Sequence, residues 1–543
     1  MKRRRNRSPG RRAVVVGAVL AMVMGPWTAA HVLTGAQGAH ALTPPVGLTA
    51  DELPTWQTNG IVWAAAQAHG VVFAGGTFSA VRPPGSPAGS NERQALNFAA
   101  FDAATGKPTD CRLSFTIGSG TAKVDALAVS PDGETLYAGG SFGAVNGTGV
   151  SSLAAVDVDT CTVKSSFRPS VPAPVHALDV SPDGGTVYFG GDFTSVAGQA
   201  RGRFAAVGTN GALRPWNPGA DKPGRAVEVL PGTGAGGVQR VAVGGDFNTV
   251  GATHTRSHAL AVVDAASGGL VRAYPGFIEP ASVVKTITSD ATGFYTGNEG
   301  TGGGVFDGRI ALDLDDLDQR WRDTCLGATQ TLKVYHSVLY SGSHAHDCSS
   351  MGEFPDGRRR HLLAQSVDDP TLLGWFPDTN DGLVEAIGPR ALTVSTAGGT
   401  DYMWVGGTFT TVNGKAQQGL TRFADGPDTR VPYVPEVSGS STEAGKVRLS
   451  WRSSLDLDDS ELTYRVYRNG GSTPVHTVTG SSSPWLRPQL TFTDSSVTPG
   501  STCTYRVTAS DGTNTSGLSA TVSVKVAGHT VLTPARHHAL GTP

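Results

Sequence analysis

The stretch VVFAGGTF (71–78) recurs along the chain, as TLYAGGSF (135–142), TVYFGGDF (186–193), RVAVGGDF (240–247) and YMWVGGTF (402–409). Two weaker copies, FYTGNEG (294–300) and LYSGSHA (339–345), lie between the fourth copy and the last. The first glycines of neighbouring copies are 45 to 64 residues apart. A period of this length predicts one structural unit used seven times, with each unit packed on the next because none can bury its apolar face alone.

Each unit carries further strand signals around the glycine phrase. An apolar run and a Pro-Asp-Gly turn precede it, as in VDALAVSPDGETLYAGGSF (124–142), and a second apolar run follows it, as in LAAVD (153–157). An aromatic-marked segment such as LRPWNP (213–218) comes next in most units. Four short strands repeated seven times predict an all-β fold, a seven-bladed β-propeller.

The two ends of the repeat region predict ring closure. The last unit stops after LTRFA (420–424) and lacks a fourth strand, whereas LPTWQTNG (53–60) precedes the first unit and has the composition of one. We therefore expect the N-terminal strand to complete the last blade and to remove an exposed edge. The paired glycines are expected to let backbones approach closely. The Phe after each pair is expected to form core between blades.

The first 41 residues have the pattern of a secretory signal peptide. Seven Lys and Arg residues lie within positions 2–12, an apolar core spans 13–25, and Ala39-His40-Ala41 offers a small-residue cleavage site. The pair Arg11-Arg12 leaves the export route, general or twin-arginine, open. The sequence thus predicts a secreted, extracellular protein with no membrane span once the signal is removed.

Charge after that removal argues against one class of partner. Residues 42–543 hold 36 Lys and Arg against 45 Asp and Glu, a net charge of −9. Nucleic acids are bound through basic stripes, and none is visible in the sequence. We expect no nucleic-acid partner.

Five cysteines in an exported chain predict disulfides. Cys325 and Cys348 bracket the first hairpin of the sixth unit, and Cys111 and Cys161 occupy similar places in adjacent units, so these are the expected pairs. Cys503 is left as a buried free thiol on a strand. None of the cysteines has the Cys-x-x-Cys spacing of a structural zinc site.

The composition changes after the repeats. We divide the chain into signal peptide (1–41), propeller (42–424), Pro-rich linker (425–436), a second domain (437–527) and a tail (528–543). Segments such as VRLSWRSS (447–454) and STCTYRVTA (501–509) alternate with period two, which predicts a β-sandwich.

The second domain resembles a fibronectin type III domain over about residues 432–527. Trp451 matches the core tryptophan of that family, and PGSTCTYRVTA (499–509) matches the signature of its penultimate strand, with Cys503 where the family usually has Tyr. The resemblance implies a spacer or adhesion module.

The repeats also resemble a known type. The pattern of GGTFTTVNG (406–414) is similar to the delta-60-type propeller repeat of large secreted bacterial proteins, over about residues 54–424. Together with the fibronectin-like module, the chain resembles secreted actinobacterial proteins.

Aligning the units reveals charged positions that we expect at one mouth of the propeller channel. Each innermost strand tends to have one early polar residue, and the second strands end in another; the ligand-binding candidates are Asp125, His176, Asp192, Arg225, Asp246, Lys285, Glu299 and Glu385. A cleft of mixed charges is a candidate ligand site. The other interpretation is that channel residues are polar because water fills the channel.

The sixth unit departs most from the pattern. SGSHAHDC (341–348) brings His344, His346 and Asp347 together in sequence, and Ala345 replaces the core Phe, which the fifth unit also lacks. Departure from a core pattern is expected where function overrides packing. A divalent metal is one hypothesis for these three residues, and a degenerate blade with exposed histidines is the other. We expect no other cofactor.

These observations predict a secreted, non-catalytic binding or adhesion protein whose partner at the channel mouth is an extracellular polysaccharide or a protein. The alternative is a secreted carbohydrate-active hydrolase that degrades polysaccharides with a pair of mouth carboxylates, which glycosidases hold about 5 or 6.5–9.5 Å apart. A metal-dependent oxidoreductase would rest on the histidines alone.

Overall fold

The computed structural model describes residues 47–233, 237–355, 357–384 and 387–528. The expected signal peptide, most of the tail and Glu385 lie outside these residues. The described chain consists of strands and one short 3-10 helix, η1 (Ser349–Met351). No helix among the described residues is long and apolar enough to cross a membrane.

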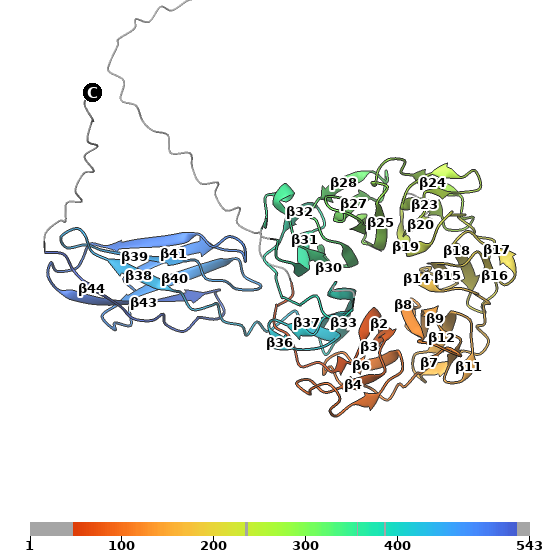
Figure 1. Ribbon diagram of the computed structural model, residues 1–543, viewed down its shortest axis with the longest axis horizontal. Coiled ribbons are helices and arrows are strands. Elements are labelled where there is room, and N and C mark those ends of the chain that lie inside the picture. Colours follow the sequence, from red (N-terminus) through yellow and green to blue (C-terminus); the bar gives the residue numbers. More distant parts are fainter. Residues whose placement is uncertain (1–46, 234–236, 356, 385–386, 529–543) are drawn as a thin grey trace, which may run out of the picture. The chain divides into compact units, whose positions relative to one another are not determined.

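Seven antiparallel sheets of three or four strands follow one another along residues 61–424 (Figure 1). The first three contain β2 (Ile61–Ala68), β3 (Val71–Thr77) and β6 (Phe98–Asp102); β8 (Lys123–Val129), β9 (Thr135–Ser141), β12 (Leu153–Asp157) and β13 (Thr162–Val163); and β14 (Val175–Val180), β15 (Thr186–Gly191) and β18 (Phe204–Gly208). The fourth and fifth contain β19 (Gly224–Thr233), β20 (Val238–Gly245), β23 (Leu260–Asp264) and β24 (Leu270–Ala273); and β25 (Ser282–Ser289), β26 (Gly293–Gly300), β27 (Arg309–Asp313) and β28 (Gln319–Asp323). The sixth and seventh contain β29 (Thr329–Tyr335), β30 (Val338–Ala345), β31 (Arg360–Ser366) and β32 (Asp369–Leu372); and β33 (Pro389–Ala397), β34 (Thr400–Gly407) and β37 (Leu420–Ala424).

The other strands up to residue 424 are short and form small separate sheets of two or three strands. They are β1 (Gln57–Thr58), β4 (Ala80–Arg82), β5 (Arg93–Gln94), β7 (Phe115–Thr116), β10 (Ala144–Val145), β11 (Thr148–Gly149), β16 (Ser195–Val196), β17 (Gln199–Ala200), β21 (Thr249–Val250), β22 (Thr255–Arg256), β35 (Thr411–Val412) and β36 (Lys415–Ala416).

The seven sheets close into a ring around a common centre. The innermost strands contact one another in the order β2, β8, β14, β19, β25, β29 and β33, and β33 contacts β2 again (Figure 1). This closed arrangement is β-propeller-like.

An N-terminal segment also lies along the outer strand of the seventh sheet. This segment is residues 49–53, whereas the sequence indicates residues 53–60. The N–H of Thr49 donates to the carbonyl of Ala424 at 2.8 Å, and that of Leu53 to Arg422 at 3.0 Å. Residues 49–53 therefore run beside β37. The expected segment 53–60 instead contains β1, which pairs with β4, because the chain is already crossing to the first sheet at this point.

The paired glycines are sites of close backbone and side-chain approach. A Cβ atom at Gly75 would lie 2.4 Å from Cγ1 of Val124 on the next innermost strand. At Gly406 it would lie equally close to Val62, across the closing contact of the ring. The second glycine of the pair faces its own sheet, where a Cβ at Gly76 would lie 2.0 Å from the carbonyl oxygen of Ile61. No side chain fits at these distances, so the glycines set the spacing of the ring.

Between the fifth and sixth sheets the core combines an apolar cluster that includes Tyr295, Trp321 and Leu339 with a buried polar network. The side chains of Arg309 and Asp323 are 1% and 0% exposed and form an ion pair, with Nε of Arg309 3.0 Å from Oδ2 of Asp323. Arg309 also donates to Oγ of Ser341 at 2.9 Å, and Gln365 donates to Asp323 at 2.6 Å. Buried charges persist only when paired and hydrogen-bonded. The missing Phe of these two repeats, interpreted from the sequence as a mark of function, accompanies a different packing of the core.

The expected disulfides are present. Cys111 is bonded to Cys161 and Cys325 to Cys348, and Cys503 is buried and free. The ring carries both disulfides, whereas the free thiol belongs to the second domain.

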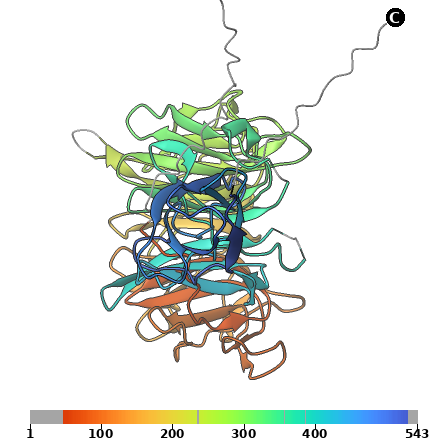
Figure 2. The ribbon, with the colours of Figure 1, turned by 90° about the vertical axis from the view of Figure 1, so that its left-hand side faces the viewer.

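The C-terminal strands, blue in Figure 1 and Figure 2, form a sandwich of two antiparallel sheets. One contains β38 (Val437–Ser440), β39 (Val447–Arg452) and β42 (Gln489–Asp494), and the other β41 (His476–Ser481), β40 (Glu461–Arg468), β43 (Thr502–Ser510) and β44 (Val522–Lys525). Their shared core contains Trp451, Tyr464 and Tyr505. The hydroxyl of Tyr505 donates to the carboxylate of Asp494 at 2.9 Å, so this tyrosine ties the two sheets together.

The glycine spacing gives a stability prediction. A Cβ at Gly139 would lie 2.6 Å from Cγ1 of Val175, whereas one at Gly143, four residues later, would meet nothing within 4 Å. Gly139→Ala should lower the free energy of unfolding by about 1–3 kcal/mol through overpacking. Gly143→Ala should change it by less than about 1 kcal/mol. Chemical denaturation of both variants tests this, and equal effects would contradict the role given to the first glycine.

Candidate functional site

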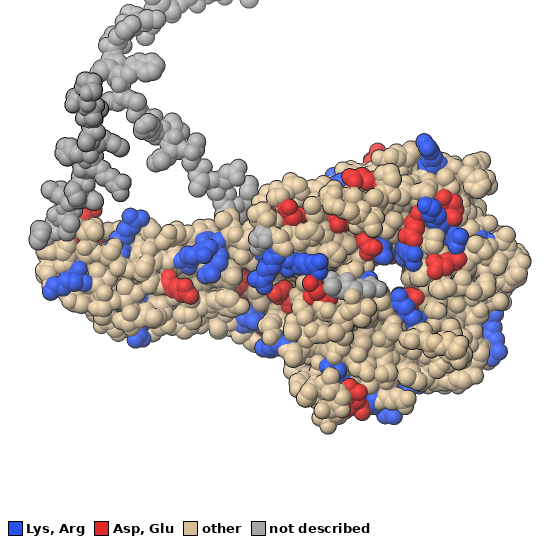
Figure 3. Space-filling view, in the orientation of Figure 1, with Lys and Arg blue, Asp and Glu red and all other residues tan. Residues whose placement is uncertain are grey.

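All seven innermost strands slip by one residue against their second strands at the same place. The residue at each slip is a bulged residue, which the ladder leaves unpaired. The bulged residues are Trp63, Asp125, His176, Arg225, Lys285, Gln330 and Arg390. Six of them line a cavity of about 200 Å³ at the centre of the ring, and Figure 3 shows the opening there with acidic and basic side chains around it. We call this end of the channel the mouth.

One chain of contacts runs along the second and third sheets. Lys123 Nζ lies 2.7 Å from Oδ1 of Asp125, and Oδ2 of Asp125 lies 3.8 Å from Nδ1 of His176. Nε2 of His176 lies 3.0 Å from Oδ1 of Asp192. Asp192 directly follows β15, so the first two strands of one sheet bring their polar ends together.

The fourth and fifth sheets repeat this pairing. Arg225 contacts the carboxylate of Asp246 through two nitrogens, at 2.8 and 3.1 Å. Burial opposes the charge of Arg225, but the hydrogen bond to Asp246 and the charges of the nearby aspartates together outweigh it and raise the pKa of the guanidinium. Lys285 lies 3.5 Å from Glu299. In both sheets the cation comes from the bulge and the carboxylate from the second strand.

The remaining mouth side chains link the fifth sheet back to the first. Gln330 donates to Glu299 at 2.5 Å and accepts from Arg390 at 3.0 Å. The ring of Trp63 receives both Arg390 and Lys123, at 4.3 and 3.6 Å from its centroid. Cations over an indole face are attracted by its quadrupole. The mouth is therefore a nearly continuous circle of contacts.

Among the described residues, the charges of this circle balance. Each carboxylate has a cationic or imidazole neighbour within 4 Å, and the four cations and four carboxylates are Lys123, Arg225, Lys285, Arg390, Asp125, Asp192, Asp246 and Glu299. Such a mouth presents alternating charge and no strong net field.

The structure thus places seven of the eight ligand-binding candidates at the mouth, and Glu385 lies outside the described residues. That these residues bind a ligand stays a prediction. In the seventh sheet the bulged residue is Arg390, which alignment of the sequence missed together with Gln330 and Lys123. The position of the bulge, at a similar distance before the glycine pair in each unit, would have identified Arg390 and Gln330. The bulge is a one-residue insertion in the innermost strand, and the pattern of polar residues in the sequence does not reveal it.

A second set of polar residues lies three positions further along the innermost strands. Oδ2 of Asp179 accepts from the backbone N–H of Val229 at 2.7 Å, and Oε1 of Glu228 accepts from the hydroxyl of Ser289 at 2.7 Å. Burial raises the pKa of Asp179 to about 6. Burial and the charge of Asp179 raise that of Glu228 to about 8, while Lys333 opposes both shifts. Sequence reasoning missed this pair because it counted only the first polar residue of each strand.

The suspected metal ligands of the sixth unit make some contacts of their own, but Nδ1 of His344 is buried without a hydrogen bond among the described residues, and metal binding stays a prediction. Nε2 of His344 accepts from the backbone N–H of Ala328 at 3.3 Å, and burial lowers the pKa of His344 to about 4. The carboxylate of Asp347 accepts from the N–H of Ser349 at 2.9 Å. The His344 and His346 rings stack with centroids 6.2 Å apart. Among the described residues, the His, Cys, Asp and Glu groups close enough to share an ion do not include these three.

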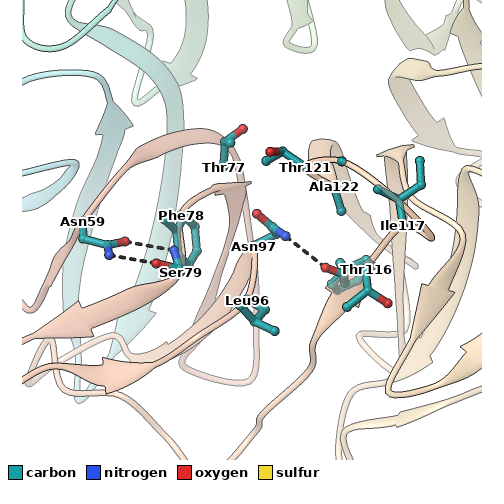
Figure 4. Close-up of a pocket in the computed structure, with 12 residues that line it drawn as sticks. Asn59, Thr77, Phe78, Ser79, Leu96, Asn97, Thr116, Ile117, Thr121 and Ala122 are labelled. Atoms are coloured by element: carbon teal, nitrogen blue, oxygen red, sulfur yellow. Dashed lines mark hydrogen bonds between the residues drawn. The ribbon is translucent and has the colours of Figure 1, made fainter.

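A cavity of about 430 Å³ lies beside the mouth, between the first and second sheets (Figure 4). Thr77 joins the two, because it lines the cavity and accepts a hydrogen bond from Nε1 of Trp63 at 3.0 Å. Nδ2 of Asn97 donates to the carbonyl of Phe115 at 2.9 Å, which leaves its Oδ1 directed toward the cavity (Figure 4). The lining side chains are neutral amides, hydroxyls and apolar groups: Asn59, Thr77, Phe78, Ser79, Leu96, Asn97, Thr116, Ile117 and Thr121.

Comparison with known proteins gives distant fold matches. No family model and no curated protein matches the chain. Among solved structures, Sqt1 of Saccharomyces cerevisiae matches at 10% identity over 70% of this chain and 100% of that one, with a TM-score of 0.40. A chain of a mitotic checkpoint complex matches at 14% over 72% and 98% (TM-score 0.41), and an oligogalacturonate lyase from Vibrio parahaemolyticus at 10% over 72% and 93% (TM-score 0.38). The likeness is to β-propeller proteins.

The raised pKa of Glu228 gives a pH prediction. Between its ordinary value of 4.5 and about 8, the folded protein keeps a proton that the unfolded chain has lost, so stability falls as pH rises through this range. Glu228→Gln removes that loss and should raise Tm by about 2–4 °C at pH 8, with almost no change near pH 4.5. Thermal unfolding at both pH values tests this, with exposed Glu134→Gln as the control. An equal shift at both pH values would contradict it.

Proposed function

We propose that the chain is a secreted seven-bladed β-propeller with a C-terminal fibronectin type III module, and that it binds an extracellular glycan without catalysis. The observation that supports the proposal is charge balance at the mouth next to a neutral cavity. A mouth whose carboxylates are already paired offers little to a charged ligand. The cavity beside it, lined by amides, hydroxyls and apolar side chains, suits a neutral polyhydroxyl ligand.

Two side chains of the cavity, Ile117 and Asn97, also support glycan binding. Ile117 is 37% exposed at its edge, where it can cover an apolar sugar face, and Asn97 offers an acceptor from the cavity floor. Pre-formed sites of this kind combine an apolar surface with a few fixed polar groups. The fibronectin-like module would serve as a spacer, as the resemblance implies.

A binding assay tests the proposal. The mature protein is incubated with a panel of neutral and acidic polysaccharides, and retention is measured by co-sedimentation and calorimetry. We expect binding to a neutral glycan that Ile117→Ala weakens about 3- to 10-fold. Val238→Ala, at an equally apolar exposed position away from the cavity, is the control. Binding to none of them would contradict the proposal and favour a protein partner. Binding unchanged by Ile117→Ala would place the site elsewhere.

One observation favours a second candidate, a glycoside hydrolase. A general acid must stay protonated near neutral pH, and Glu228, whose pKa is raised to about 8, meets that requirement better than the paired mouth carboxylates. Its neighbour Asp179 would supply the second carboxyl group that such enzymes require.

Release of reducing ends from the same panel tests the second candidate. Glu228→Gln should then lower the rate about 10²- to 10⁴-fold, and Glu134→Gln should leave it unchanged. Loss in Asp192→Asn with full activity in Glu228→Gln would instead assign the chemistry to the mouth. No release from any polysaccharide would exclude this candidate for the panel.

A further inference from the structure

Five aspartates gather where the C-terminal sandwich meets the segment before it. Three of them, Asp456, Asp458 and Asp459, lie in the loop between β39 and β40. Asp511 follows β43, and Asp428 lies between β37 and β38. Three separate parts of the chain therefore supply acidic groups to one place.

The carboxylate oxygens are close enough to share an ion. One oxygen each from Asp456, Asp458 and Asp459 lie within 4.8 Å of one another, and so do oxygens from Asp428, Asp459 and Asp511. Oxygens on opposite sides of a Ca²⁺ ion, each about 2.4 Å from it, are about 4.8 Å apart. Asp459 belongs to both groups and links them.

Two of these side chains are almost completely buried, and each has one carboxylate oxygen without a hydrogen bond. Asp456 is 6% exposed and Asp458 8% exposed. Oδ2 of Asp456, Oδ1 of Asp458 and Oδ2 of Asp511 are buried without any hydrogen bond among the described residues. Their other oxygens are in use: those of Asp456 and Asp511 accept from loop N–H groups, and that of Asp458 accepts from the N–H of Ala50 at 2.5 Å. Buried carboxylate oxygens without partners are costly.

No protein cation compensates the cluster. In the described part of the chain, none of the five aspartates forms an ion pair with Lys or Arg. The cluster therefore brings together carboxylates that no Lys or Arg of the described residues pairs with, and a bound cation would compensate their charge.

We propose that this cluster binds calcium, through Asp456, Asp458 and Asp459 with Asp428 and Asp511 completing the site around Asp459. The donors are all oxygens, which excludes a preference for the softer metals that seek His or Cys. Several protein carboxylates and few waters suit Ca²⁺, whereas Mg²⁺ keeps most of its waters and takes one or two carboxylates. The bound ion would tie the segment that contains Asp428 to the sandwich. This inference does not depend on the proposed glycan site.

The acid-rich run DLDDLDQ (313–319) provides an internal comparison. Asp315 and Asp316 are exposed, and Asp318 pairs with Arg272. Sequence composition alone does not separate this run from LDLDDSE (455–461), but burial and missing partners do. Asp315→Asn is therefore a matched control for the cluster.

The test uses the full mature chain, stripped with a chelator and dialysed. Thermal unfolding and calorimetry are measured with about 2 mM CaCl₂, with MgCl₂, and with chelator. We expect calcium to raise the Tm of one transition by about 5 °C, and magnesium to have a much smaller effect. The Asp456→Asn/Asp458→Asn double variant should lose the calcium shift, and Asp315→Asn should keep it.

Behaviour in chelator separates a lost site from a damaged fold. Neutralising two repelling carboxylates removes a cost that the metal-free protein carries, so the double variant should be at least as stable there as the unaltered chain. If the double variant does not fold, the proposal is tested by the calcium shift in the Tm of Asp459→Asn and by calorimetric titration of the unaltered chain with calcium. A Tm of the unaltered chain that calcium leaves unchanged, with no heat of binding, would overturn the proposal, and so would a calcium shift that the variants retain.

Discussion

Close approach between the second strand of one sheet and the innermost strand of the next is the constraint on which the rest of the ring depends. At Gly75 and Gly406 there is no room for a Cβ beside the valine of the next strand. Each of these valines directly precedes the bulged residue of its own strand, as Val124 precedes Asp125. One contact therefore sets the spacing of the sheets, and the bulge beside it turns a polar side chain toward the centre. The structural repeat and the candidate site arise from the same few residues.

The ring tolerates two different kinds of core. Most neighbouring sheets pack through aromatic side chains, as Phe204 and Phe247 do with ring centroids 6.0 Å apart. The fifth and sixth sheets add the buried pair of Arg309 and Asp323 to the apolar packing of Tyr295 and Trp321. Such a pair is a weak source of stability, but it tolerates no loss of one partner. Departure from the repeat pattern thus accompanies a change of packing here, and a functional role of His344, His346 and Asp347 stays a prediction.

Charge is handled in opposite ways in the two parts of the molecule. At the mouth of the ring, bulged cations and strand-end carboxylates neutralise each other, as Arg225 and Asp246 do. In the loops of the sandwich, carboxylates gather without a protein cation and leave oxygens unpartnered. The first arrangement is the basis of the proposed neutral glycan ligand, and the second is the basis of the proposed calcium site.

The sequence by itself determined what is periodic or local: the seven strand units, the change to a sandwich after residue 424 and both disulfide pairs, because alternation and spacing are written along the chain. It also indicated most mouth residues, since aligned units occupy equivalent places. Only the tertiary structure decided which segment closes the seventh sheet, that Arg390 completes the mouth, and that Asp428 and Asp511 join the aspartates at 456–459. These depend on one-residue bulges and on contacts between distant segments, and neither leaves a periodic trace in sequence.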